Sequence, residues 1–317
     1  MTILYNVLVR NHHVEGGNVA VIELESTDPV ALPKVEAGAH IDVHLPNGMV
    51  RQYSLCQNPN DTGRFRLGIL RDAESRGGSV CAFDDLKVGS QLQVSEPKNL
   101  FPLLQSPHTI LVGGGIGITP LITMAYQLYH QGASFELHYC GTSPEQCAFV
   151  DEIKKGVLSA FTRFHFKSAG ANHREFFQTA IQDIRKDSHI YTCGPNGFMD
   201  WMINLATTQH FPEQQIHKEH FQVDVETSGD AFEVVAQRSG KTILVHAEET
   251  ILHALAREGI EIEMSCEQGV CGTCMCDVIE GEPDHRDVYF TDEEKISNEQ
   301  ILVCCSRSKS ARLVLDI

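Results

Sequence analysis

Cys266-Glu-Gln-Gly-Val-Cys271-Gly-Thr-Cys274, followed by Cys304, is the stretch of this 317-residue chain from which its architecture can first be inferred. Three cysteines fall within nine residues, and 29 residues separate the third from the fourth. This three-plus-one spacing matches the ligand set of a plant-type [2Fe–2S] cluster. The glycines between the cysteines let backbone amides approach the sulfurs, and such hydrogen bonds help to set the redox potential. The motif therefore predicts a one-electron carrier.

Four cysteines also suit other structures. A tetrahedral zinc site usually takes two close pairs of ligands, whereas this set divides three and one, which favours the cluster. A disulfide framework is disfavoured because the chain begins Met-Thr-Ile-Leu-Tyr-Asn, without an apolar signal segment, and its other cysteines are scattered. Cys305 competes with Cys304 for the fourth position, but Cys304 gives the usual separation, and Cys276 is expected in a strand.

The composition excludes several classes of function. The formal net charge of −17 argues against nucleic acid as a partner, and no apolar run is long enough to span a membrane. Eleven cysteines without a secretory signal lead us to expect a cytoplasmic protein. Residues 226–317 hold 19 acidic and 8 basic side chains, so −11 of the net charge lies there. This acidity is either a solubility surface or a means of steering the chain toward a basic patch on an electron acceptor.

Residues 1–103 are predicted to form a small antiparallel β-barrel. Short alternating runs at 19–24, 39–44 and 91–94 are separated by turn signals, and Asn47-Gly48 is typical of a hairpin turn. Closely spaced strands without long helical patterns indicate this architecture.

Residues 104–223 are predicted to form an α/β domain with a parallel sheet. A buried-strand pattern at 109–112 enters the loop Gly113–Pro120, and a helical pattern follows to about Gln131. Further strands are expected at 135–139 and 189–192, and a helix at 196–208. In such a domain ligands bind at the carboxyl ends of the strands.

Residues 231–317 follow a polar stretch, 224–230, that we interpret as a linker. Strands are expected at 232–237, 242–245 and 311–316, with one helix near 250–258 before the cysteine loop. These elements predict a compact α+β unit around the cluster.

Two segments of the barrel have the chemistry that a flavin requires. Arg51-Gln52-Tyr53-Ser54 offers a cation for phosphate, an aromatic ring and hydrogen-bonding groups, and alternation places Arg51 and Tyr53 on one face. Gly77-Gly78-Ser79 precedes a short helix whose bare amides would suit a phosphate. Taken singly, the first fits a surface arginine beside a packed tyrosine, and the second an ordinary serine-capped turn.

A glycine-rich loop follows the first strand of the α/β domain. Gly113, Gly114, Gly115, Gly117 and Thr119 permit close approach to a pyrophosphate, although the loop departs from both G-x-G-x-x-G and the P-loop pattern. A tight structural turn is the alternative. Cys193-Gly194-Pro195 ends the last predicted strand and faces the same crevice. Its thiol either packs near a nicotinamide or is an inert buried cysteine.

In this order, Arg-x-Tyr-Ser, Gly-Gly-Ser, Gly-Gly-Ile-Gly-Ile-Thr-Pro and Cys-Gly-Pro resemble the ferredoxin–NADP⁺ reductase superfamily. With the C-terminal cysteine motif, the chain is similar over essentially its whole length to the phthalate dioxygenase reductase and vanillate O-demethylase reductase family. Pro97–Leu103 and Asp284-His285-Arg286-Asp287 also resemble that family.

The resemblance implies a multidomain fold: a flavin-binding barrel, an NADH-binding α/β domain and a β-grasp, ferredoxin-like α+β domain. It implies FMN rather than FAD, NADH as electron donor, a Rieske-type non-haem iron oxygenase as acceptor, and a monomer. Arg51–Ser54 and Gly77–Ser79 would hold FMN, Phe221 would cover the flavin ring, and Gly113–Thr119 with Cys193–Pro195 would bind the nucleotide. Cys140-Gly141-Thr142-Ser143 lacks the arginine of several relatives, which argues against NADP.

Two alternatives remain at this level. A flavin reductase of the same superfamily would serve another electron acceptor. A non-enzymatic redox sensor would use the cluster as a regulatory ligand, but it would need neither the glycine loop nor Cys193-Gly194-Pro195.

Overall fold

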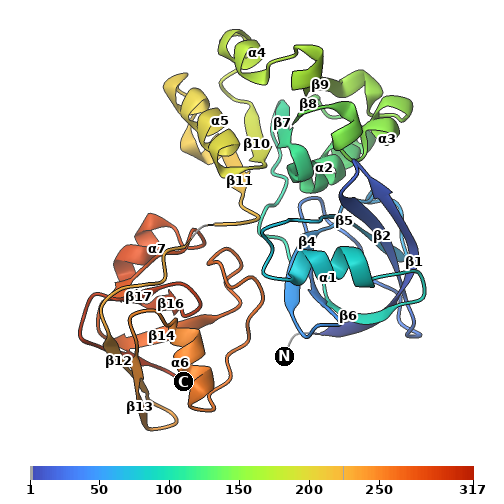
Figure 1. Ribbon diagram of the computed structural model, residues 1–317. Coiled ribbons are helices and arrows are strands. Elements are labelled where there is room, and N and C mark those ends of the chain that lie inside the picture. The colour runs from blue at the N-terminus through green and yellow to red at the C-terminus, as the bar shows by residue number, and fades with distance from the viewer. Residues whose placement is uncertain (1–2, 224) are drawn as a thin grey trace. The chain divides into compact units, whose positions relative to one another are not determined.

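The computed structural model describes residues 3–223 and 225–317 (Figure 1). The chain divides into two compact units, Met1–His220 and Phe221–Ile317. The first unit contains one antiparallel and one parallel sheet, and the second contains a mixed sheet. None of the described helices is long and apolar enough to cross a membrane. The described residues include all eleven cysteines, and none of them forms a disulfide.

The antiparallel sheet of the first unit is a six-stranded barrel in the order β4-β3-β6-β1-β2-β5. A bridge between Leu55 and Leu67 joins the ends of the order, and Cys56 N donates to Arg66 O beside it. Apolar residues at alternate positions, such as Ile22 and Leu24, fill the interior. The predicted barrel and its hairpin at Asn47-Gly48 are confirmed. The elements are β1 (Leu4–Glu15), β2 (Val19–Ser26), β3 (His40–His44), β4 (Val50–Ser54), β5 (Arg64–Leu70), α1 (Gly78–Asp85) and β6 (Gln91–Ser95).

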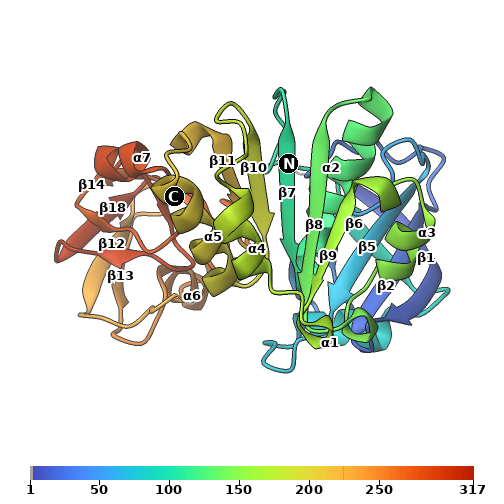
Figure 2. The same ribbon diagram turned by 90° about the horizontal axis from the view of Figure 1, so that it is seen from above.

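The parallel sheet has the order β11-β10-β7-β8-β9, and all its strand pairs are parallel. Figure 2 shows α4 and α5 on one face and α2 on the other. The first strand, β7, is buried throughout, as its apolar sequence predicts. The chain order reverses between β7 and β10, which creates a switch point at their carboxyl ends. The elements are β7 (Thr109–Gly114), α2 (Ile118–Gln131), β8 (Phe135–Gly141), α3 (Val150–Lys155), β9 (Thr162–Phe166), α4 (His173–Ala180), β10 (His189–Cys193), α5 (Asn196–Thr208) and β11 (Ile216–Glu219).

A partly buried polar network connects the barrel to the parallel-sheet half. Arg66 on β5 forms two hydrogen bonds with Glu152 on α3, at 3.1 and 2.5 Å. The Tyr126 hydroxyl donates to the same carboxylate at 2.7 Å, and the Thr123 hydroxyl donates to the Leu55 carbonyl at 2.7 Å. A bidentate arginine–carboxylate pair has a defined direction, so this network sets how the two halves meet.

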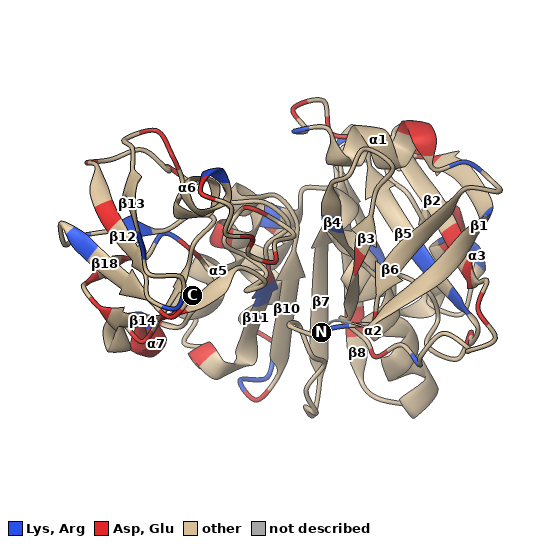
Figure 3. Cartoon of the chain, turned by 90° about the horizontal axis from the view of Figure 1, so that it is seen from below, with Lys and Arg blue, Asp and Glu red and all other residues tan. Residues whose placement is uncertain are grey.

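The second unit has a five-stranded sheet in the order β13-β12-β18-β14-β16, in which β12 and β18 run parallel. Buried apolar residues of helix α6 and of the strands form one core, as expected for the predicted α+β unit. Figure 3 shows acidic residues on α7 and in the loops of this unit. The elements are β12 (Phe232–Ala236), β13 (Lys241–Val245), α6 (Ile251–Arg257), β14 (Met275–Glu280), β15 (Pro283–Asp284), α7 (Asp292–Ser297), β16 (Gln300–Leu302), β17 (Arg307–Ser308) and β18 (Arg312–Leu315).

Residues 225–230 are held against the second unit, although the sequence suggests a linker at 224–230. Position 224 lies outside the described residues. The Arg286 guanidinium donates to the carbonyl oxygens of Glu226 and Ser228. Arg307, only 2% exposed, donates to the carbonyls of five residues and stacks on the Phe232 ring at 5.1 Å. Those five residues are Thr227, Gly229, Asp230, His246 and Glu249.

Replacing Arg307 with Met should destabilise the second unit by roughly 3 kcal/mol or more, because several buried carbonyls lose their donor. Chemical denaturation of the intact protein, followed by the iron–sulfur absorbance, measures the change. Arg312→Met, at an exposed position of β18, is the matched control and should have little effect. Equal loss in the two variants would contradict this role for Arg307.

Candidate functional site

Arg51 lies across the N-terminus of helix α1. A methyl group at Gly78 would lie 2.7 Å from Arg51 Nε, so the side chain packs directly on the helix backbone. The Asn47 amide donates to the Gly77 carbonyl at 3.3 Å and holds the turn against β4. The helix N-terminus and the guanidinium therefore meet, and both favour an anion.

The amides at this helix N-terminus are not bare, so that part of the sequence prediction is wrong. The backbone N–H groups of Gly77 and Ser79 both donate to Ser75 Oγ, at 3.1 and 3.3 Å. The Ser79 hydroxyl accepts from Asp72 N at 3.3 Å. Ser75 thus supplies an oxygen where the sequence suggests a phosphate oxygen, because a serine hydroxyl satisfies the same donors.

The remaining residues of the β4 motif face different surroundings. The buried Tyr53 hydroxyl has no hydrogen-bond partner within the described residues, and burial raises the pKa of Tyr53. Gln52 donates to Asp42 Oδ1 at 3.0 Å. The buried Ser54 hydroxyl donates to Glu219 Oε2 at 3.4 Å. The Tyr53 hydroxyl lacks a partner in the described part of the chain and lies on the same strand as the Arg51 guanidinium. Both groups fit a flavin, which would supply the missing hydrogen bond.

The glycine loop and the Cys193 loop touch at the switch point of the parallel sheet. A methyl group at Gly117 would lie 2.2 Å from the Cys193 carbonyl oxygen, so only glycine permits this approach. A methyl group at Gly194 would lie 3.0 Å from Gly114 Cα. Gly113 lies in register with Cys193, and the Pro195 carbonyl accepts from the first turn of α5. Several of these glycines therefore serve loop packing, which was the structural alternative.

Thr119 also helps to pack the glycine loop. Its hydroxyl donates to the Ile116 carbonyl at 3.0 Å, and its methyl group packs against Gly68 on β5 of the barrel. Thr119 therefore closes the loop and contacts the barrel at once.

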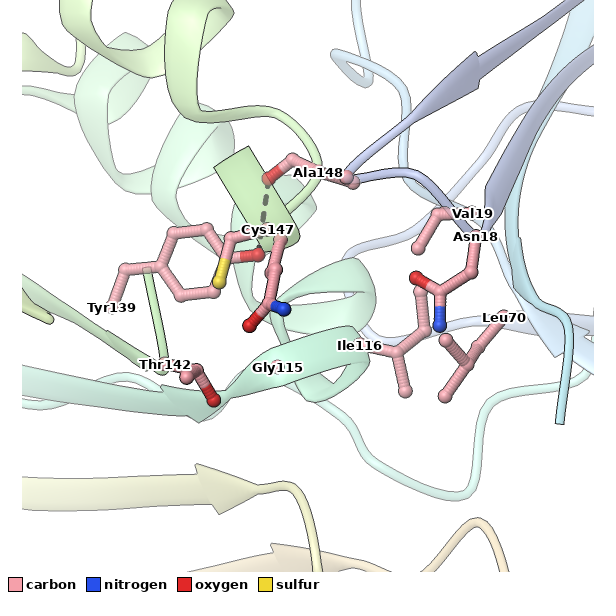
Figure 4. A pocket seen from close by; sticks show the side chains of 11 residues that line it. Asn18, Val19, Leu70, Gly115, Ile116, Tyr139, Thr142, Cys147 and Ala148 are labelled. Atoms are coloured by element: carbon pink, nitrogen blue, oxygen red, sulfur yellow. Dashed lines mark hydrogen bonds between the residues drawn. The ribbon is translucent and has the colours of Figure 1, made fainter. Parts of the chain in front are cut away.

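Gly115 differs from the other glycines of the loop because a methyl group there would meet open space. It borders a cavity of about 380 Å³ between the barrel and the ends of β7 and β8 (Figure 4). Among the described residues that line this cavity there is no lysine or arginine. Its other lining residues are Gly16, Asn18, Val19, Leu70, Ile116, Tyr139, Thr142, Gln146, Cys147 and Ala148.

Glu219 is a residue that the motif analysis missed. It ends β11 in register with Cys193 on β10, and it accepts the hydrogen bond from Ser54 of the barrel. Burial raises the pKa of Glu219 to about 8, although the Ser54 hydroxyl opposes this. Burial, and then the Glu219 carboxyl, raise the pKa of the Cys193 thiol. Its place at the end of a strand, two residues before Phe221, was the available signal.

Three of the four cluster cysteines are buried, and the Cys266 thiol interacts with those of Cys271 and Cys304. Gln268 N donates to Cys266 Sγ at 3.3 Å, and Thr273 N donates to Cys271 Sγ at 3.4 Å. Within the described ranges, no three His, Cys, Asp or Glu side chains converge as ligands of one ion would. A [2Fe–2S] cluster does not require such convergence, because two irons share its four thiolates.

The neighbouring Cys305 has a different environment from Cys304. It is 1% exposed, and its thiol donates to the Leu302 carbonyl at 3.7 Å. A methyl group at Gly269 would lie 2.7 Å from Cys305 Sγ, so this thiol supports the cluster loop from behind. Cys276 lies on β14, as predicted.

Phe221 is the first residue of the second unit and is partly exposed there. Its proposed position over a flavin ring remains a prediction.

Comparison with known proteins agrees with this architecture. Residues 234–309 match the family model of the 2Fe-2S iron-sulfur cluster binding domain. The vanillate O-demethylase oxidoreductase of Pseudomonas sp. (strain HR199 / DSM 7063) is 40% identical over 317 residues, covering 99% of this chain and 100% of that protein. The tetrachlorobenzoquinone reductase of Sphingobium chlorophenolicum is 41% identical, covering 93% of this chain and 92% of that protein.

A solved structure is similar over the same extent. The structure described as phthalate dioxygenase reductase, a modular structure for electron transfer from pyridine nucleotides to [2Fe–2S], is 35% identical with a TM-score of 0.78. The match covers 99% of this chain and 98% of that chain. The fold and the site define a flavin- and nucleotide-binding oxidoreductase with a [2Fe–2S] domain. The chain belongs to the phthalate dioxygenase reductase and vanillate O-demethylase reductase family, which confirms the resemblance inferred from the motifs.

Replacing Glu219 with Gln should stabilise the protein at alkaline pH relative to the wild type. Folding raises this pKa from 4.5 to about 8, so in that window the folded chain holds a proton that the unfolded chain has released. The free energy of unfolding of the wild type should therefore fall as pH rises through this window. The glutamine variant has no carboxyl at this position, so its stability should not show this fall. Thermal unfolding at about pH 5 and about pH 9 should show a Tm difference that grows in favour of Gln. A difference independent of pH would contradict the raised pKa.

Proposed function

We propose that this protein is an NADH-dependent reductase that passes electrons through FMN and its [2Fe–2S] cluster to a Rieske-type non-haem iron oxygenase. The observation that carries the proposal is the meeting of Ser54, Cys193 and Glu219. This meeting brings the end of β4, which would bind the flavin, to the switch point of the parallel sheet, which would bind the nucleotide. A hydride donor and a flavin need such a meeting, since the reacting atoms must come into contact.

When bound, the flavin converts the two electrons of a hydride into single electrons, and the cluster carries these one at a time. The protein supplies binding and orientation. Arg51, which packs on Gly78, would hold the flavin phosphate, and the Tyr53 hydroxyl would gain a partner. The cavity beside Gly115 would hold part of the dinucleotide. Glu219 and Ser54 would orient groups at the reacting ring, while the packed loops exclude water from it.

Relatives named as oxidoreductase components of O-demethylase and monooxygenase systems support an oxygenase partner. NADH rather than NADPH is proposed from the family resemblance and from Cys140-Gly141-Thr142-Ser143, where several relatives have an arginine. FMN and a monomeric state are proposed from the family resemblance, and a cytoplasmic location is proposed from the eleven cysteines of the sequence.

Reduction of another acceptor is a second candidate. It is favoured by the relative named tetrachlorobenzoquinone reductase, which is as similar to this chain as the vanillate relative. In that case, electrons would pass to a small organic oxidant.

An anaerobic NADH titration, followed by visible absorbance and low-temperature EPR, tests the proposal. Flavin and cluster should bleach together, and full reduction should take about one and a half equivalents of NADH, because the flavin accepts two electrons and the cluster one. Flavin bleaching with a cluster that stays oxidised would contradict the relay. A colourless, zinc-containing protein would contradict the cluster assignment.

The matched pair Cys304→Ser and Cys305→Ser tests the fourth ligand in the same titration. Cys304→Ser should lose the reduced-cluster EPR signal while NADH still bleaches the flavin. Cys305→Ser should keep the signal, because its thiol faces Leu302 and the back of the loop. The opposite pattern would assign Cys305 as the ligand.

A further inference from the structure

Two backbone amides of the cluster loop, residues 266–274, donate hydrogen bonds to the sulfurs of predicted ligand cysteines. The amide of Gln268 does so at 3.3 Å, and this residue directly precedes Gly269. The amide of Thr273 does so at 3.4 Å, and this residue directly follows Gly272. Because amide–sulfur hydrogen bonds help to set the potential of an iron–sulfur cluster, whatever fixes the two glycines also affects that potential.

A turn that begins at Asp287 packs against both glycines. A methyl group at Gly269 would lie 3.0 Å from Asp287 Cα, and the Val288 amide donates to the Gly269 carbonyl at 3.1 Å. A methyl group at Gly272 would lie 2.4 Å from the Tyr289 ring. In a close-packed interior, the loop cannot shift at either glycine unless this turn also moves.

The Asp287 carboxylate closes this turn. The side chain is 0% exposed, and its Oδ2 atom accepts hydrogen bonds from the amides of Tyr289 at 3.1 Å and Phe290 at 2.9 Å. An aspartate that accepts from the amides of the next residues fixes the path of the backbone. Lys295 on α7 donates to the Asp287 carbonyl oxygen at 2.7 Å and adds a second anchor. Without the carboxylate, two backbone donors of the turn would lose their partner.

The charge of this carboxylate is only partly balanced. Its Oδ1 atom has no hydrogen-bond partner within the described residues and lies 3.6 Å from His285 Nδ1. The Lys295 ammonium is 4.0 Å from Oδ2. A buried negative charge beside the loop disfavours the addition of an electron to the cluster. Asp287 therefore has two opposite effects, because its charge lowers the potential while the turn that it closes keeps the amide donors in place.

We propose, on the basis of the [2Fe–2S] cluster in the proposed function, that Asp287 is a positioning residue of the iron–sulfur site. Its carboxylate fixes the two amide donors of the cluster loop through the turn that it closes. Amides that donate to sulfur stabilise the reduced cluster, which carries more negative charge. Loss of the turn should let the amides of Gln268 and Thr273 move away from the sulfurs, and the reduction potential should then fall.

Asp287→Asn and Asp287→Ala form a matched pair, because both remove the charge and only asparagine keeps an oxygen that can accept from the turn amides. Redox titration of purified holoprotein with dithionite, followed by the reduced-cluster EPR signal, gives the potential of each variant. Reduction of the cluster should be about tenfold less favourable in Asp287→Ala than in Asp287→Asn, which corresponds to about 59 mV for one electron. Asp287→Asn should itself be easier to reduce than the wild type, because a buried negative charge is gone.

Hydrogen exchange of the same holoproteins measures the loop itself. Mass spectrometry of peptides from the cluster loop should show faster exchange at the amides of Gln268 and Thr273 in Asp287→Ala than in Asp287→Asn. The reason is that a weakened hydrogen bond to sulfur leaves the amide open to solvent for more of the time.

Asp284→Asn and Asp284→Ala are the control pair. Asp284 belongs to the same Asp-His-Arg-Asp motif, but its carboxylate accepts from Arg286 Nε at 2.8 Å instead of from the turn amides. These two variants should have equal potentials and equal amide exchange. If Asp287→Ala purifies without iron, Lys295→Met takes its place, because it removes the second anchor of the turn and should also speed exchange of the loop amides.

Equal potentials in Asp287→Ala and Asp287→Asn would overturn the proposal, as would equal exchange of the loop amides. Where Lys295→Met is the variant used, exchange at the wild-type rate would overturn it. Dithionite reduces the cluster without NADH, so a failure of the proposed electron route would leave these comparisons intact. Absence of iron from the wild type would instead overturn the cluster assignment.

Discussion

The bidentate pair between Arg66 and Glu152 is the interaction on which the first unit depends. It joins β5 of the barrel to the parallel-sheet half, and the Tyr126 hydroxyl completes it. Because the pair is largely buried, its geometry must be maintained, since an unpaired buried charge is costly. The contact between Ser54 and Glu219 can exist only when the two halves meet in this arrangement. The end of β4 and the carboxyl end of the parallel sheet are thereby brought together.

The two loops at the switch point also depend on close contacts. Gly117 lets the glycine loop rest on the Cys193 carbonyl, and Thr119 extends the contact to the barrel. Of the loop glycines, Gly115 is the one beside the cavity with open space around it. A glycine-rich loop can therefore be mostly a packing device and still leave one position for a ligand. Residue type alone does not distinguish these uses, because both need the absence of a side chain.

Local patterns predicted most of the architecture. The helix Asn196–Thr208 has the bounds that its periodicity indicates, and the carboxyl ends of the parallel strands carry the predicted loops. The amides of Gly77 and Ser79 were predicted wrongly, because Ser75 folds back onto them. Glu219 escaped prediction because it and Ser54 are 165 positions apart, and a single acidic residue in a strand has no distinctive pattern.

The cluster motif, the order of the three sheets and the family could all be inferred from the sequence, because ligand spacing and strand periodicity are local properties of the chain. The tertiary structure alone places Ser54 against Glu219, and it alone places the Arg307 guanidinium against the carbonyls of Thr227, Gly229 and Asp230. These are contacts between distant parts of the chain, and each depends on strand register and on the burial of polar groups. Register and burial arise from packing of the whole fold, so no local pattern contains them.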